Sequence, residues 1–332
     1  MCYHIYVMEK KRIEWIDIAK GIAIILMVAA HSMKWRLPIR NYIFSFHMPI
    51  FLSLSGYSIK LSIDKNEIIK NIKKDFKHLI GNYLLFALVA IILEFIFSKE
   101  HNLEVINKLL THQGLALLWG SGIEVYDYPT IGMIWFLLSL FTAKLIIYIC
   151  HYYFHDNKFE TISYFIFPII GILLAIYPIY LPLNLDVSFV CVFFVYIGML
   201  YKKYENYLDE HNILLILFAF IIQFALLGSN YIFDISGRTY TGLTLSFICA
   251  ICGEYLLICL SKALCETKYI KKFLSLLGIE SLMVLFVHYQ DFIIMRYISF
   301  GPGFKRSLIG LLIVIPISLL FIYIKRLIKK KV

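Results

Sequence analysis

Long apolar runs follow one another along almost the whole chain, and they constrain the fold more than any other feature of the sequence. A membrane-spanning helix needs about 20 mainly apolar residues, because the hydrocarbon core of a bilayer is about 30 Å thick. The sixth of the runs is short and is expected to be tilted or partly re-entrant. The candidate spans are residues 13–33, 43–60, 79–97, 131–150, 162–181, 187–201, 213–228, 240–260, 275–295 and 306–324.

The composition agrees with a membrane protein. The chain is 61% hydrophobic and 16% charged, whereas a soluble domain is about 45–50% apolar and about 25% charged. Residues 103–122 are less apolar, because Lys108, His112 and several glycines interrupt them, and they are expected on the membrane surface. The predicted fold is an all-α integral membrane protein of about ten transmembrane helices, forming a single membrane-embedded domain over residues 1–332.

The net charge of +10 predicts membrane orientation rather than nucleic-acid binding. Most lysines and arginines lie in short segments between the apolar runs, and one side of the membrane receives the larger share. That side holds both chain ends and the loops 60–78 and 261–274, so the positive-inside rule places both termini in the cytoplasm. The protein is therefore expected to be multi-pass in the plasma or inner membrane, in contact with its lipids.

The cysteines are interpreted as small apolar packing residues. Five of the seven lie within the apolar runs, and Cys249-x-x-Cys252 has no second pair to complete a metal site. No metal is expected.

The first apolar run, Glu14 to Ser32, carries Asp17, Lys20 and His31. Because Asp17 and Lys20 interrupt it and further spans follow, it is interpreted as a retained helix and not as a signal peptide. Lys20 and His31 are separated by close to three helical turns, so they share a face and lie about 16 Å apart along the axis. Asp17 shares that face and is expected to pair with Lys20. The alternative is a polar packing cluster with a snorkelling lysine.

Three histidines are expected at one depth near the outer membrane surface. With both termini in the cytoplasm, His31 ends the first helix, His47 lies near the start of the second, and His288 lies in the outer half of the ninth. Imidazole is well suited to take a proton from a hydroxyl near neutral pH. Lys20, nearer the cytoplasm, suits a phosphate. A donor with phosphates inside and a reactive acyl group on a long arm, such as coenzyme A, matches this spacing.

Four segments of the chain resemble the acyltransferase 3 family of membrane O-acyltransferases, which includes fucose 4-O-acetylase-like proteins. Lys20 and His31 match the Arg/Lys-x10-His pattern of that family's first helix. The other segments match its Phe-His-Met-Pro…Ser-Gly-Tyr, Trp-Phe-Leu and Gly-x-x-Ser-Leu…His motifs. The four segments are WIDIAKGIAIILMVAAHS (15–32), IFSFHMPIFLSLSGYSIK (43–60), MIWFLLSLF (133–141) and LLGIESLMVLFVHY (276–289).

The sequence departs from the family pattern at two places. Lys20 stands where arginine is commoner, which keeps the charge but loses a bidentate fork. Asn82-Tyr83 stands where Pro-Tyr is expected, which concerns the entry into a helix and not the chemistry.

The resemblance implies transfer of an acyl group, usually acetyl from acetyl-CoA, to a sugar hydroxyl of a cell-surface glycan or lipid-linked sugar. By motif, His31 is implied as the catalytic base or acyl-handling residue and His47 as a second catalytic histidine. Lys20, held by Asp17, is implied as the contact for the coenzyme A phosphates.

Further polar residues are candidates for binding the acceptor. Arg238 at the outer mouth suits an acidic sugar, Trp135 suits stacking against a sugar ring, and His288 suits a polar contact. Each residue also has a structural interpretation. Arg238 could be an interface arginine, Trp135 part of an aromatic belt, and His288 a packing contact. Glu254 and Asp291 are intramembrane carboxylates and therefore additional candidates.

Two other functions use the same residue types. A secondary transporter relays protons through intramembrane His, Lys and Asp, although no pair of similar halves is visible. A subunit that only moves acyl groups to a separate extracytoplasmic transferase is the other alternative. The acceptor, the acyl group and the oligomeric state stay open at this level.

Overall fold

The computed structural model describes residues 12–31, 33, 37–98, 100–155, 157–227, 231–298 and 304–331, with the backbone alone over 226–227, 292–298, 304–309 and 329–331. Nearly all of this part of the chain is helical. The α-helices are α1 (Glu14–His31), α2 (Pro38–Ser58), α3 (Lys65–Asp75), α4 (Gly81–Phe97), α5 (Leu103–Trp119), α6 (Trp135–Phe154), α7 (Lys158–Ile176), α8 (Leu185–Glu210), α9 (Asn212–Leu227), α10 (Thr244–Leu264), α11 (Lys268–Ile279), α12 (Ser281–Ile298) and α13 (Phe304–Lys331).

Short irregular elements join the helices. A π-helical turn, η1 (Phe76–Ile80), connects α3 to α4, and the 3₁₀ turns η2 (Gly132–Ile134) and η3 (Pro182–Asn184) lead into α6 and α8. The strands β1 (Phe233–Asp234) and β2 (Thr239–Tyr240) form a small antiparallel hairpin before α10. This hairpin explains why α10 begins at Thr244 and not at residue 240, where the apolar run begins.

The protein is an all-α membrane protein apart from this hairpin. Within the described residues, six helical stretches are long and apolar enough to cross a bilayer: Lys65–Phe97, Gly132–Phe154, Lys158–Ile176, Pro182–Glu210, Thr244–Leu264 and Gly310–Ile328. Apolar side chains such as Ile213 and Phe224 of α9 are 71% and 80% exposed, as expected of a surface that faces lipid.

Two predicted spans differ in extent from the helices that form. The short sixth run lies within α8, which is 26 residues long because the polar stretch KKYENYLDE continues the helix past the apolar residues. The ninth run, 275–295, is divided between α11 and α12 at Glu280. The apolar pattern continues through this break, so hydrophobicity alone does not reveal it.

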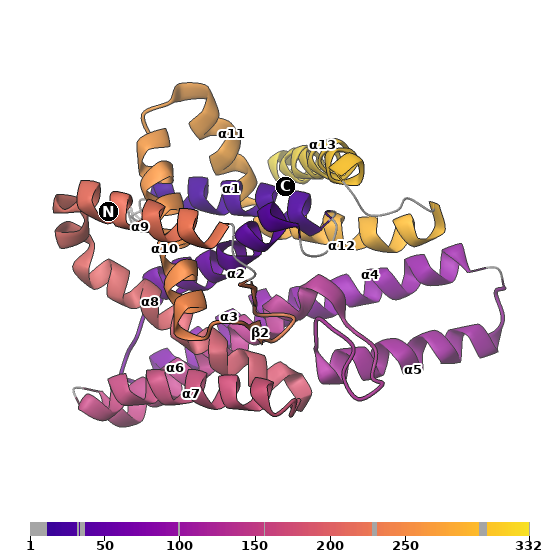
Figure 1. Cartoon of the computed structure of the whole chain (residues 1–332). Helices are drawn as coiled ribbons and strands as arrows, with labels where there is room; N and C mark the ends of the chain where they lie inside the picture. Colours follow the sequence, from indigo (N-terminus) through magenta and orange to yellow (C-terminus); the bar gives the residue numbers. More distant parts are fainter. Residues whose placement is uncertain are drawn as a thin grey trace, which may run out of the picture.

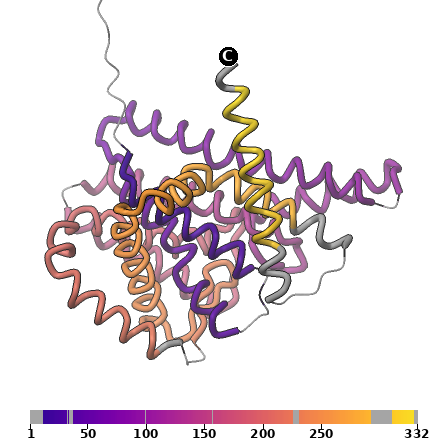
Figure 2. The backbone as a smooth tube through the Cα atoms, turned by 90° about the horizontal axis from the view of Figure 1, so that it is seen from above, coloured from indigo at the N-terminus to yellow at the C-terminus, as the bar shows by residue number. Residues whose placement is uncertain are grey.

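Helices α1 and α2 lie at the centre of the molecule. Both views place them between α13 on one side and α8, α9 and α10 on the other (Figures 1 and 2). Glycines permit the closest crossings: a Cβ on Gly278 of α11 would overlap the Asp17 carbonyl oxygen of α1, and one on Gly198 of α8 would overlap the Ser53 carbonyl oxygen of α2. The backbones therefore touch where these helices cross.

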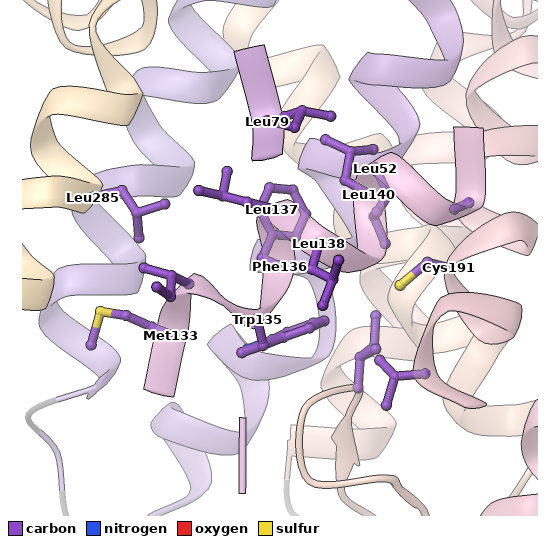
Figure 3. Packing of buried hydrophobic residues seen from close by; sticks show 14 of the residues in the cluster. Leu52, Leu79, Met133, Trp135, Phe136, Leu137, Leu138, Leu140, Cys191 and Leu285 are labelled. Carbon is purple, nitrogen blue, oxygen red and sulfur yellow. The ribbon is translucent and has the colours of Figure 1, made fainter. Parts of the chain in front are cut away.

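The largest apolar core surrounds the start of α6. In Figure 3, side chains of residues 133–140 lie between Leu285 of α12 on one side and Cys191 of α8 on the other. Ile134 and Leu137 in this segment are fully buried. The packing fixes the N-terminal end of α6 beside α1, α2 and α12.

Helices α4 and α5 run antiparallel, side by side, and extend away from this core (Figure 1). The Tyr83 hydroxyl donates to the Leu117 carbonyl oxygen at 2.9 Å, near the core end of the pair. Farther out, the Gln113 amide donates to Glu94 at 3.1 Å. Helix α5 therefore packs along α4, whereas the sequence predicted only a position on the membrane surface.

Candidate functional site

Three helices bring His31, His47 and His288 together. The ring centroids of His31 and His47 are 6.0 Å apart, and those of His31 and His288 are 5.8 Å apart. His47 is 1% exposed and His288 is fully buried, whereas His31 is half-buried. The three histidines, predicted to share one depth, thus lie together where α1, α2 and α12 meet.

The backbone fixes the ring of His47. Its Nδ1 lies 2.9 Å from the Ile43 carbonyl oxygen, one turn earlier in α2. Because a carbonyl oxygen only accepts, Nδ1 carries the proton of this hydrogen bond. In the neutral ring, Nε2 then holds the lone pair, and it has no hydrogen-bond partner among the described residues. His47 therefore presents a buried proton acceptor next to His31.

A pocket opens beside His31 and His47, and we call it the histidine pocket. Trp135, predicted as a sugar-stacking residue, lines it and is 3% exposed. The hairpin before α10 supplies a further wall with Asp234 and Ser236. The full lining is Met27, His31, Phe44, His47, Met48, Met133, Trp135, Asp234, Ile235 and Ser236.

Asp234 is the main polar residue of this pocket that the sequence did not single out. It is 6% exposed, and its carboxylate accepts a hydrogen bond of 2.9 Å from the Gly237 N–H. Burial raises the pKa of Asp234 above its ordinary value, while the Gly237 N–H and the charges of Arg40 and Arg238 oppose that rise. The pocket thus holds a carboxyl group with a raised proton affinity a short distance from two imidazoles.

Arg238, predicted to bind an acidic sugar, forms an internal network. Its Nε lies 2.5 Å from Asp186, and Nη2 donates to Asn184 at 2.8 Å and reaches Asp186 at 3.5 Å. Nη1 donates to the Ser121 hydroxyl at 3.0 Å and the Ser236 carbonyl oxygen at 3.2 Å. These contacts engage all five guanidinium N–H groups, so Arg238 anchors the hairpin to α8 and to the loop after α5.

Lys20 and His31 lie on one unbroken helix, α1, so the separation expected from the sequence is retained. Lys20 is half-buried and lies within electrostatic range of Asp17 and of His78 in η1. The ion pair of Asp17 is formed with Arg12, at 3.2 Å, and not with Lys20 as predicted. Arg12 precedes the helix, so its long side chain can fold back onto the first turn of α1.

The two intramembrane carboxylates lie in different surroundings. Asp291 is one turn beyond His288 on α12, and its Oδ2 lies 4.0 Å from His288 Nδ1. Glu254 accepts a hydrogen bond of 2.7 Å from Ser53 and lines a separate, mainly apolar pocket between α2, α8 and α10. Within the described part of the chain, no group of three or more His, Cys, Asp or Glu side chains is arranged to hold a metal ion.

The helical fold and the buried histidine cluster define a membrane protein with acid–base groups at one end of its core. A family model described as an acyltransferase domain matches residues 13–326, nearly the whole chain. The chain therefore belongs to the acyltransferase 3 family, and the protein is a membrane acyltransferase. Comparison with curated proteins and with solved structures gives no match.

Proposed function

We propose that the protein is an O-acetyltransferase that moves an acetyl group from acetyl-CoA to a sugar hydroxyl of a cell-surface glycan or lipid-linked sugar. The observation that carries the proposal is the contact of His31 with His47 and His288 beside the histidine pocket. Membership of an acyltransferase family supports acyl transfer, and the imidazoles supply the base that a hydroxyl acceptor needs.

The donor is proposed to lie along α1. Lys20 is an ammonium group suited to a coenzyme A phosphate, and His31 follows about 16 Å farther along the same helix. A coenzyme A arm laid beside α1 would bring its thioester to the histidine pocket. In this arrangement the phosphates stay near the cytoplasm while the acetyl group reaches the outer part of the protein.

In the proposed reaction, the acceptor oxygen forms a bond to the acetyl carbonyl carbon while its proton passes to the imidazole of His31. The carbon–sulfur bond then breaks, and coenzyme A leaves as a thiolate that takes up the proton. His47 offers its Nε2 lone pair as a second proton acceptor beside His31. A two-step route, with the acetyl group first on a histidine ring, gives the same products.

The test is mass spectrometry of surface glycans from cells that lack the gene and carry a variant. His31→Ala should abolish O-acetylation, because it removes the base that faces the histidine pocket, and His47→Gln should lower it at least about 100-fold.

Lys20→Met tests the donor site. It should raise the KM for acetyl-CoA about 10- to 100-fold in membranes, the factor expected for one charge-assisted hydrogen bond.

The matched control is His211→Ala, because His211 is exposed at the end of α8 and its ring contacts Tyr207, one turn earlier in the same helix, away from the histidine pocket. It should leave acetylation unchanged. Full acetylation in the His31→Ala cells would refute the assignment. Flux of a substrate without any change in acetyl content would point to a transporter. Failure of the purified protein to acetylate a glycan alone would point to an acyl-translocating subunit.

A further inference from the structure

A second pocket, which we call the polar pocket, lies between α4, α5, the loop before α6 and α12. Its walls carry two carboxylates, an amide, an imidazole and two hydroxyls, and no lysine or arginine among the described residues. The lining residues are Glu94, His112, Gln113, Glu124, Pro129, Thr130, Ile131, Gly132, Met133 and Tyr289. The mechanism proposed above uses none of them.

Gln113 is a buried polar residue in the wall of the polar pocket. The residue is 5% exposed, and its amide nitrogen donates to Glu94, which is itself 8% exposed. This hydrogen bond fixes the amide and directs its oxygen away from Glu94. The Oε1 atom has no hydrogen-bond partner within the described part of the chain. A buried amide oxygen without a partner costs roughly 1–3 kcal/mol, so a ligand hydroxyl or amine would find a favourable contact here.

The polar pocket adjoins the histidine pocket. Met133, at the start of α6, lines both. On α12, His288 contacts His31, while the next residue, Tyr289, lines the polar pocket and packs against Gly132, where a Cβ would lie 3.2 Å from the ring. Met133 and the adjacent α12 residues His288 and Tyr289 therefore connect the surroundings of the two pockets.

We propose that the polar pocket is the acceptor-sugar site and that it selects neutral or amino sugars over acidic ones. This inference rests on the proposed function and names its substrate class. Sugar hydroxyls donate hydrogen bonds that Gln113, Glu94 and Glu124 accept, whereas a uronic acid would bring its carboxylate next to two others. Arg238, the residue that the sequence indicated for an acidic sugar, is engaged by Asp186 and Asn184.

Saturation-transfer NMR on the purified full-length protein tests this selection without requiring catalysis. The probes are methyl β-D-galactopyranoside, methyl β-D-glucopyranoside, glucosamine and galacturonate. The wild type should give signals with the first three and at least fivefold weaker ones with galacturonate. Gln113→Leu should reduce the neutral-sugar signals about five- to tenfold, the factor for one hydrogen bond.

The matched control is Gln223→Leu, since Gln223 is also a buried glutamine whose amide donates to a neighbour, here the Cys249 carbonyl oxygen, away from the polar pocket. It should keep the sugar signals. Glu94→Gln preserves the side-chain shape and should bring the galacturonate signal to within twofold of the neutral sugars, which tests the site even if Gln113→Leu fails to fold.

Two results would overturn the inference: equal sugar signals in wild type and Gln113→Leu, or a wild-type preference for galacturonate. A different result would contradict the proposed function. His31→Ala should keep the sugar signals while it abolishes acetylation, so sugar binding with retained acetylation in that variant would contradict the catalytic assignment alone.

Discussion

At the scale of single residues, the structure divides the polar side chains of the apolar runs into two groups. His31, His47 and Trp135 line one pocket, the place where we propose that acyl transfer occurs. Arg238 and Asp17, by contrast, are engaged by neighbouring charges, Asp186 and Arg12. The type of residue is the same in a site and in a structural network, and only the geometry of its partners separates the two.

Arg238 provides the residue-scale prediction. Arg238→Met should lower the free energy of unfolding by roughly 3–5 kcal/mol, because it leaves Asp186, which is 2% exposed, as an uncompensated buried charge. Thermal unfolding of the purified protein measures the effect. The double variant Asp186→Asn with Arg238→Met should recover part of the loss. Unchanged stability together with lost sugar binding would show instead that Arg238 contacts the acceptor.

At the scale of elements, close crossings determine where the site forms. Helix α1 lies against α11 with Gly278 at the Asp17 carbonyl oxygen, and α2 lies against α8 with Gly198 at the Ser53 carbonyl oxygen. Small residues let helix backbones approach in a membrane, where van der Waals contact replaces the hydrophobic effect as the main attraction. These crossings hold α1 and α2 in the positions that bring His31 to His47.

Gly278 provides the element-scale prediction. Gly278→Ala should destabilise the protein by about 1–3 kcal/mol or more, because the added methyl group would meet the α1 backbone and separate α1 from α11. Gly114→Ala is the control: this glycine lies inside α5 with open space where a methyl group would point, so alanine should be neutral or slightly stabilising there. Similar melting temperatures for both variants would contradict the tight crossing.

At the scale of the whole molecule, the histidine pocket and the polar pocket lie side by side at one end of the helical core. The segments that form them are far apart in the sequence: α1, α2, α4, α5, the loop before α6 with the start of α6, the hairpin before α10, and α12. The proposed orientation puts this end outside the cell, where a surface glycan is accessible, and puts the basic loop 60–78 in the cytoplasm.

Topology gives the whole-molecule prediction. In a variant without native cysteines, Tyr126→Cys lies at an exposed position before α6 and should react with a membrane-impermeant maleimide on intact cells. Lys70→Cys, exposed on α3, should react only after the cells are permeabilised. Labelling in the opposite order would reverse the orientation and place the histidine pocket on the cytoplasmic side.

The sequence by itself determined the helical membrane class, the family and the alignment of Lys20 with His31, because hydrophobic length and helical periodicity are local properties. It also predicted that three histidines share one depth. The tertiary structure alone decided that these rings meet, that Asp234 and Ser236 join them, that α11 and α12 separate at Glu280, and that Gln113 lies beside Glu94. Such contacts join segments far apart in the chain, so they depend on how the helices cross, and no local pattern specifies the crossing.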